Sequence, residues 1–269
     1  MTELKEVLAV VNNKGGVAKT TTVQNLAAGL MQRTPGTRVL VIDLDPQSNL
    51  SSLCGWSGAD RKSGRPTMFT AMQQEAPLPV YKSASGVYYA PSDPRLQDVD
   101  ADLQRAMQPK RVLCECFGQD VDDHTGDGLT DVVSSFDYIL IDCPPALSQT
   151  TYNAMAVATG LLVPVQMEGL SVNGLGSILS EMLRVQRGLN EHLTLKGILP
   201  VMVDARPNIV KGFLELLKRD YDCVLTTKIR RCIKVTEAQT QCQDIFSYAP
   251  QCTAAQDYAA LVSEIFPED

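Results

Sequence analysis

The stretch that decides the fold is residues 10–22, with the sequence VVNNKGGVAKTTT. An apolar run at residues 7–11 leads into it, and apolar residues at helical spacing follow it. This order predicts a strand, a glycine-rich loop and a helix that begins at the loop. Backbone N–H groups converge at a helix N-terminus, where the helix dipole adds positive potential, so this loop is suited to holding phosphate. A glycine-rich turn without a ligand is the alternative.

The loop departs from the usual phosphate-binding pattern G-x-x-x-x-G-K-[ST], because Asn13 and Ala18 occupy the two glycine positions. It carries instead a second lysine, Lys14, at the start of K-G-G-x-x-K-T-T. This arrangement resembles the deviant Walker A loop of the ParA/MinD family of P-loop ATPases. The resemblance implies that ATP is held by Asn13, Lys14, Gly15, Gly16, Val17, Ala18, Lys19, Thr20 and Thr21.

Three side chains of this loop have expected roles. Lys19 is expected to reach the β- and γ-phosphates, and the Thr20 hydroxyl to lie on Mg²⁺. The resemblance implies that Lys14 crosses a dimer interface and touches the partner subunit's nucleotide, so Lys14 and Lys19 both have catalytic roles. If the position of Ala18 requires a positive φ, alanine is strained there by roughly 1 kcal/mol.

The composition restricts the class of protein. A chain of 269 residues with 44% hydrophobic content fits a single α/β domain over residues 1–269. The net charge is −7, so binding to DNA or anionic lipid requires a local basic patch. The sequence has no signal-peptide pattern and no apolar run of membrane-spanning length. The eight cysteines include no C-x-x-C pair, which indicates reduced thiols in a cytoplasm.

A second motif follows the apolar run at residues 39–42, which predicts a buried parallel strand. The strand ends in D-L-D-P-Q-S-N at residues 43–49, and open α/β sheets bind ligands at the carboxyl ends of their strands. The motif resembles the family's switch I, D-x-D-P-Q-x-N. The resemblance implies that Asp45 orients the attacking water and that Asp43 helps to order the Mg²⁺ shell. An Asp-Pro turn that only ends the strand is the alternative.

A third motif is the apolar run at residues 138–141, which ends in D-C-P-P. The resemblance identifies Asp142 with the Walker B aspartate, which holds Mg²⁺ through a water, and Cys143-Pro144-Pro145 with the start of switch II. Nothing near Cys143 in the sequence activates it as a nucleophile, so we expect a small buried residue.

Residues 54–126 carry the least information and correspond to a variable insertion in the family. Residues 56–66 are rich in Gly, Ser and Arg and predict a mobile loop. Helices are predicted at 68–72 and 96–107, and a short strand at 87–90. The acidic run at 120–127 lacks the glycine and the closing glutamate of a calcium loop, so a solvated acidic loop is predicted.

The C-terminal half continues the α/β pattern. Strands are predicted at 161–166 and 195–203, and helices at 173–188, 209–221 and 253–266. The segment D-A-R-P-N at residues 204–208 resembles the family's D-x-R-T-N, which lines the adenine. The resemblance therefore implies that Asp204 lies at the edge of the base.

Residues 228–238 carry four basic side chains, Lys228, Arg230, Arg231 and Lys234. The segment resembles the family phrase I-P-R-N-V-R-L-S-E-A-P, although Arg230, Cys232 and Gln239 replace a proline, an asparagine and the final proline. We predict contacts with the DNA phosphate backbone that give no sequence preference. A dimer presents two such patches and so binds DNA more tightly. A solvated basic face is the alternative.

These motifs predict a doubly wound, mostly parallel β-sheet with helices on both faces, as in P-loop NTPases. The resemblance is closest to ParA-type ATPases without an N-terminal helix-turn-helix domain, because few residues precede the first strand. It implies a cytoplasmic, nucleoid-associated DNA-partitioning ATPase with ATP and Mg²⁺ as cofactors. It also implies an ATP-dependent homodimer that binds non-specific DNA, and slow hydrolysis that a ParB-like centromere-binding protein stimulates.

Three alternatives remain open from the sequence. A relative that positions a protein cargo shares every motif. A membrane-positioning ATPase of the MinD type is disfavoured, because the chain ends P-E-D and not in a basic amphipathic helix. A binding module in which ATP only controls dimerisation is the third, if Ala18 prevents hydrolysis.

Overall fold

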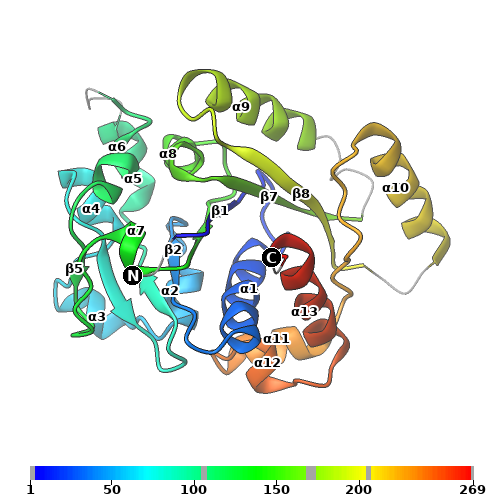
Figure 1. The fold of residues 1–269 in the computed structure, drawn as a ribbon, viewed down its shortest axis with the longest axis horizontal. Coiled ribbons are helices and arrows are strands. Elements are labelled where there is room, and N and C mark those ends of the chain that lie inside the picture. The colour runs from blue at the N-terminus through cyan, green and yellow to red at the C-terminus, as the bar shows by residue number, and fades with distance from the viewer. Residues whose placement is uncertain (1–3, 104–107, 168–173, 204–206, 268–269) are drawn as a thin grey trace.

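The strands of the protein form one mixed sheet. The computed structural model describes residues 4–103, 108–167, 174–203 and 207–267. Within this part of the chain, eight strands lie side by side (Figure 1). In spatial order they are β5 (Asp122–Asp123), β3 (Pro79–Lys82), β4 (Tyr88–Ala90), β2 (Val39–Asp43), β6 (Tyr138–Asp142), β1 (Glu6–Val10), β7 (Gly160–Gln166) and β8 (Thr194–Val201).

The sheet is doubly wound about β1. From β1 the chain winds to one side through β2 and β4, returns to insert β6 between β2 and β1, and continues on the other side with β7 and β8. Among the described strands, neighbours are parallel except β3 and β4. The prediction of a doubly wound, mostly parallel sheet is confirmed, and the fold is that of a P-loop NTPase.

Helices cover both faces of the sheet (Figure 1). One face of the sheet packs against α1 (Lys19–Arg33), α2 (Asn49–Leu53), α11 (Ile233–Thr240), α12 (Ile245–Tyr248) and α13 (Thr253–Ile265). The opposite face packs against α4 (Met68–Gln74), α5 (Leu96–Leu103), α6 (Val112–Phe117), α7 (Val132–Ser135), α8 (Gln149–Val157), α9 (Leu175–Gly188) and α10 (Pro207–Asp220). Among the described residues, no helix is long and apolar enough to cross a membrane.

The central strands are apolar along most of their length because both of their faces are buried, and the acids that they contain lie at their ends. In β1, Val7 and Ala9 belong to one hydrophobic core, whereas Leu8 and Val10 belong to the core on the other side of the sheet. Strands buried on both sides lose the alternation that marks a half-exposed strand. This is why continuous apolar runs in the sequence located the central strands, whereas β3 and β5 at one edge of the sheet were not predicted.

The insertion departs from the sequence prediction. The predicted loop at residues 56–66 is wrong for Gly58–Lys62, which form α3. Ser57 and Asp60 cap the N-terminus of this helix with a reciprocal capping box. The Gly, Ser and Arg content of the segment obscured this local signal. Trp56 is only 2% exposed, and its ring lies 5.0 Å from that of Tyr81.

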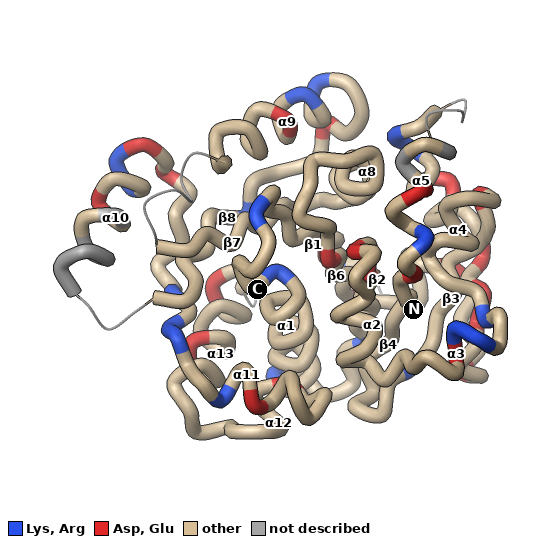
Figure 2. Tube along the Cα trace, turned by 180° about the vertical axis from the view of Figure 1, so that it is seen from behind, with Lys and Arg blue, Asp and Glu red and all other residues tan. Residues whose placement is uncertain are grey.

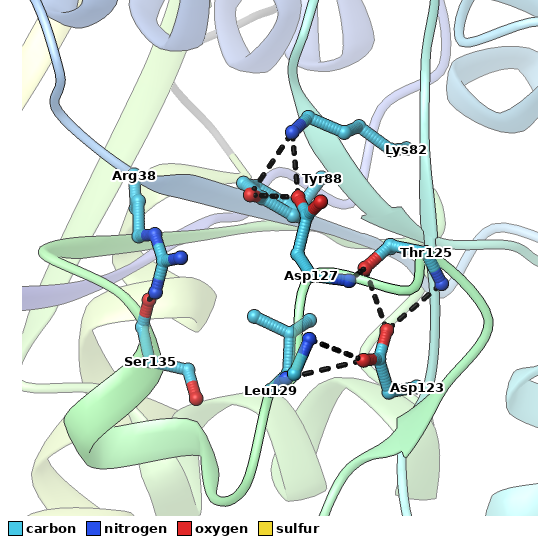
Figure 3. A network of polar contacts seen from close by, with 9 residues as sticks. Arg38, Lys82, Tyr88, Asp123, Thr125, Asp127, Leu129 and Ser135 are labelled. Carbon is cyan, nitrogen blue, oxygen red and sulfur yellow. Dashed lines mark hydrogen bonds and ion pairs between the residues drawn. The ribbon is translucent and has the colours of Figure 1, made fainter.

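The acidic run is a structured turn as well as a surface loop (Figure 3). Asp123 accepts hydrogen bonds from the Thr125 hydroxyl at 2.6 Å and from the N–H groups of Gly128 and Leu129. Asp127 accepts a hydrogen bond from Tyr88 and forms an ion pair with Lys82 at 2.6 Å. The carboxylates of Asp123 and Asp127, which a calcium ion would need, are therefore bound by donors of the chain itself. Among the described residues, no group of three or more His, Cys, Asp or Glu side chains could hold a metal ion.

Candidate nucleotide site

In the loop between β1 and α1, the residue before the helix has the positive φ under which strain was expected at Ala18. Ala18, directly before α1, has φ 59° and ψ 27°, which is the left-handed region. Gly16 also has a positive φ, of 74°. Glycine adopts this conformation freely, whereas alanine is strained in it by roughly 1 kcal/mol. The predicted strain at Ala18 is therefore present in the structure.

Asn12 anchors the loop to the neighbouring strand. Its side-chain amide donates to the carbonyl oxygen of Pro164 in β7 at 2.7 Å, and its side-chain oxygen accepts the N–H of Lys14 at 2.9 Å. Asn12 is buried, so these bonds are shielded from water. No local pattern in the sequence predicts this role of Asn12, because its partner Pro164 lies 152 residues away.

Lys19 lies across the loop that it follows. Its Nζ donates to the backbone carbonyl of Lys14 at 3.1 Å, and the residue is only 7% exposed. Burial lowers the pKa of Lys19, and the carboxylate of Asp142 opposes this most strongly. The ammonium group is therefore enclosed by the loop and next to an acid.

Two carboxylates meet at the carboxyl ends of adjacent strands. Asp43 ends β2 and Asp142 ends β6, and the two residues are paired in the register of these strands. Burial raises the pKa of Asp43 to about 7, although hydrogen bonds from Ser51 oppose the shift. Burial, followed by repulsion from Asp43, raises the pKa of Asp142 well above its ordinary value. A cation bound here would relieve both effects.

The two acids differ in how their oxygens are satisfied. Asp43 accepts hydrogen bonds from the Ser51 hydroxyl at 2.6 Å, the Ser51 N–H at 2.8 Å and the Asp45 N–H at 3.1 Å. Asp142 accepts the Thr20 hydroxyl at 2.6 Å through Oδ2, but its buried Oδ1 has no hydrogen-bond partner among the described residues. An unpartnered carboxylate oxygen beside a hydroxyl oxygen is the donor set that Mg²⁺ prefers, so Thr20 and Asp142 fit this ion.

A cavity of about 530 Å³ opens above the loop. This volume is within the range of small-molecule sites. Its wall includes most of the predicted nucleotide residues, namely Gly15, Gly16, Val17, Ala18, Lys19, Thr20, Thr21 and Asp45. The fold therefore brings the loop and the switch I aspartate to one cavity, while Asp43 and Asp142 lie deeper, at the strand ends.

The structure adds wall residues that the sequence analysis missed: Asn49, Ser52, Leu53, Pro145, Met202, Gln239 and Cys242. Gln239 donates from Nε2 to the Thr21 hydroxyl at 2.9 Å, although the two residues are 218 positions apart. The sequence had marked Gln239 only as a departure from the family's proline. Asp204, predicted at the base edge, lies outside the described residues.

The second lysine of the loop points elsewhere. Lys14 is exposed, and its Nζ donates to Gln166 Oε1 at the end of β7 at 3.2 Å. Neither Lys14 nor Asn13 lines the cavity of its own subunit. A role for Lys14 within this subunit's cavity finds no support here, and the expected role in trans stays a prediction.

The four predicted DNA contacts are exposed and follow one another into α11, beside α13 (Figure 2). Lys228, Arg230 and Arg231 line a second cavity, of about 620 Å³. Arg230 forms an ion pair with Asp257 of α13, with an Nη2–Oδ1 distance of 2.6 Å. Lys234 pairs with Glu237 at 2.8 Å. Arg230 and Lys234 are therefore each matched by a carboxylate within the chain.

Known proteins resemble this chain over nearly its full length. The model of a family described as AAA domain matches residues 5–195. The sporulation initiation inhibitor protein Soj of Bacillus subtilis is 32% identical over 261 residues, covering 97% of this chain and 98% of Soj. The chromosome partitioning protein ParA of Caulobacter vibrioides is 32% identical over 270 residues, covering 98% of this chain and 94% of ParA.

A solved structure has a similar fold. Cobyrinic acid a,c-diamide synthase from Mycobacterium smegmatis, with bound ADP and magnesium, superposes with a TM-score of 0.77 at 28% identity. The match covers 98% of this chain and 93% of that protein. A parallel sheet with a lysine-containing phosphate loop between its first strand and first helix defines a P-loop nucleotide-binding protein. The chain belongs to the ParA/MinD family of P-loop ATPases.

Proposed function

We propose that the protein is a ParA-type DNA-partitioning ATPase. It binds MgATP, closes into a homodimer around the nucleotide, holds DNA without sequence preference, and releases the DNA after hydrolysis. The observation that carries the nucleotide part is the cavity shared by the loop and Asp45, with the unpartnered Asp142 oxygen below it. The relatives named as partitioning proteins supply the biological context.

The residues present account for binding and positioning. The N–H groups of the loop and the Lys19 ammonium would hold the phosphates, because they are preorganised donors at a helix N-terminus. Thr20 and Asp142 would hold Mg²⁺, which neutralises charge on the phosphates when it is bound. Asp45 is buried at 8% exposure, lines the cavity, and accepts the Gln47 N–H through its carboxylate at 2.9 Å. A carboxylate held there would orient the attacking water.

The partner subunit completes the site in this proposal. Lys14 is exposed, and its Nζ donates to Gln166 Oε1, so a second copy facing this edge would have to draw the lysine from that contact. A lysine that enters from the partner would stabilise the charge that develops in the transition state only in the dimer. The proposal includes slow hydrolysis by the unstimulated protein and its stimulation by a ParB-like protein, and membership of the family supports both.

DNA binding would use the exposed cations at residues 228–234. Because Arg230 and Lys234 already pair with Asp257 and Glu237, a DNA phosphate must compete with these carboxylates. One subunit therefore binds DNA weakly, and two patches held in a dimer bind it more tightly through the release of additional counterions. Nucleotide-dependent dimerisation would thereby control DNA binding.

The experiment that tests this proposal is binding to random-sequence duplex DNA with ATP, ADP or no nucleotide over a series of salt concentrations. We expect salt-sensitive binding with ATP alone. The double variant Lys228→Ala/Arg231→Ala should reduce the slope of log K against log salt by roughly two per subunit. The matched control is Arg187→Ala in α9, a surface arginine distant from the patch in sequence. Dimerisation on ATP without DNA binding at low salt would instead favour a protein cargo.

A further inference from the structure

The loop that follows β4 contacts the segment at residues 43–51, which contains both acids of the switch I motif. Strand β4 ends at Ala90, and the chain continues with Pro91 and Ser92. Ser92 is 0% exposed, so its polar atoms are removed from water. A buried hydroxyl and a buried N–H group need hydrogen-bond partners within the protein. Ser92 finds a partner for each of them in the segment at residues 43–51.

The hydroxyl of Ser92 holds the backbone at Asp45. It donates to the carbonyl oxygen of Asp45 at 2.6 Å, although the two residues are 47 positions apart, and both are buried. The same carbonyl oxygen accepts the N–H of Ser48 at 2.8 Å. Two donors from different parts of the chain therefore fix the peptide group that follows Asp45. Rotation of this peptide group would move Asp45, which lines the nucleotide cavity.

The N–H group of Ser92 reaches the second acid through Ser51. It donates to the Ser51 hydroxyl oxygen at 2.8 Å. That hydroxyl in turn donates to Asp43 Oδ2 at 2.6 Å, and all three residues are buried. A serine hydroxyl has a single proton, so the bond from Ser92 leaves this proton directed to Asp43. One serine of the loop after β4 thus supports both acids of switch I.

We propose that Ser92 is a positioning residue for ATP hydrolysis. Ser92 is not among the described residues that form the wall of the nucleotide cavity, so it acts through the acids that it supports. Small displacements of a reacting group reduce the rate by large factors, so a fixed backbone at Asp45 favours hydrolysis. This role rests on the proposed function, in which Asp45 orients the attacking water.

The loop after β4 also joins helix α4 of the insertion to this support. The carbonyl oxygen of Pro91 accepts the N–H of Met68, the first residue of α4, at 2.8 Å. The guanidinium of Arg95 lies 4.3 Å from the centre of the Phe69 ring, in the next position of the same helix. The variable insertion therefore does more than cover the sheet, because its loop at residues 91–95 supplies one of the supports of switch I.

The test compares Ser92→Ala with the wild type in ATP binding and in single-turnover phosphate release. The variant loses the bond to Asp45 but keeps the backbone N–H that donates to Ser51. The loss of one buried hydrogen bond should lower the hydrolysis rate constant about fivefold and leave the dissociation constant for ATP unchanged. A parallel loss of binding and hydrolysis would mean general support of the fold and would overturn the proposal.

Ser63→Ala is the matched control. The Ser63 hydroxyl also donates to a backbone carbonyl oxygen at 2.6 Å, that of Asp60, but this bond lies on the exposed surface of the insertion. Ser63→Ala should therefore hydrolyse ATP at the wild-type rate. Equal rate constants in Ser63→Ala and Ser92→Ala would overturn the role of Ser92.

A double variant shows whether Ser92 acts through Asp45. Coupled residues give non-additive effects, so Ser92→Ala/Asp45→Ala should hydrolyse ATP as slowly as Asp45→Ala alone. A further loss of about fivefold in the double variant would mean that the two residues act independently and would overturn the proposal. Unchanged hydrolysis in Asp45→Ala would instead contradict the proposed function. A loss in Asp45→Ala together with a wild-type rate in Ser92→Ala would overturn only the role of Ser92.

Discussion

The phosphate loop and the basic segment both carry lysine or arginine, but their charges are held in different ways. Lys19 is buried, donates to a carbonyl of its own loop, and lies near acids that have themselves been desolvated. Arg230 and Lys234 are exposed, and they pair with Asp257 of α13 and with Glu237 of α11, respectively. The first arrangement is a preorganised site for one ligand, because removal from water strengthens each interaction. The second is a surface whose net attraction is weakened by its own ion pairs.

Removing Lys19 should cause the largest loss of ATP binding and hydrolysis, because its charge is buried in the phosphate loop. Lys19→Ala deletes the only buried cation among the described residues of the cavity wall, so binding of ATP and its hydrolysis should fall by roughly 10²-fold or more. Titration with a fluorescent ATP analogue and phosphate release measure the two effects. Lys14→Ala is the matched control, because it should keep nucleotide binding and lose only hydrolysis in the dimer. Equal loss of binding in both variants would contradict this assignment.

Removing the switch I carboxylate should separate binding from chemistry. Asp45→Ala retains the loop and both strand-end acids, so ATP binding should change little while hydrolysis falls roughly 10²- to 10⁴-fold. Single-turnover phosphate release with ATP in excess of its dissociation constant measures the rate. Asp60→Ala, in the exposed helix α3 far from this chemistry, is the control. Unchanged hydrolysis in Asp45→Ala would mean that another group orients the water.

The buried acids should make stability fall as pH rises. The pKa of Asp43 is about 7 in the folded protein, above the ordinary value near 4 of an unfolded chain. The folded state therefore holds the proton more tightly, and this contribution is complete below about pH 4 and lost as pH rises through 7. Between about pH 5 and 8, the metal-free protein should lose up to about 2–3 kcal/mol of unfolding free energy from this group.

Urea unfolding at several pH values measures this loss. Asp43→Asn should flatten the dependence, because the variant has no titrating group at this position. Magnesium and ATP should also reduce it, since a bound cation stabilises the ionised acids. A wild-type free energy that does not change over this range would show that the carboxylates are already compensated.

A smaller effect on DNA affinity should follow when the carboxylates that pair with the cations of the basic segment are removed. Asp257→Asn removes the charge that holds Arg230, so DNA affinity in the presence of ATP should rise a few-fold. The salt series used for the wild type measures the change. Glu237→Gln is the parallel variant for Lys234 and should act in the same direction. A decrease in affinity for both would mean that the ion pairs position the cations and do not compete with DNA.

The smallest expected change concerns the loop itself. Ala18→Gly relieves the left-handed strain but adds freedom to the unfolded chain, so the protein should gain about 0.5 kcal/mol of stability. The midpoint of urea unfolding measures it. Ala28→Gly, within α1, is the control and should be destabilising by roughly 1 kcal/mol. If Ala18→Gly is equally destabilising, the strain at this position is absent in solution.

The sequence by itself determined the sheet and the elements of the nucleotide site, because both depend on local order along the chain. A strand buried on both faces is apolar throughout, and β1, β2 and β6 each end at a conspicuous polar motif. Parallel strands bring their carboxyl ends to one edge, so the loop, Asp45 and Asp142 had to meet there. The insertion was predicted less well, since its composition obscured the local capping box of α3 and the burial of Trp56 depends on Tyr81, which is distant along the chain.

Only the tertiary structure decided which polar groups find partners. Asn12 with Pro164, Thr21 with Gln239, and Arg230 with Asp257 are contacts between distant parts of the chain. No periodicity or motif specifies such pairs, because they depend on how helices pack on the finished sheet. The same packing leaves Asp142 Oδ1 without a hydrogen-bond partner among the described residues. Local sequence fixes the kind of site, whereas three-dimensional packing sets the charge and reactivity of its groups.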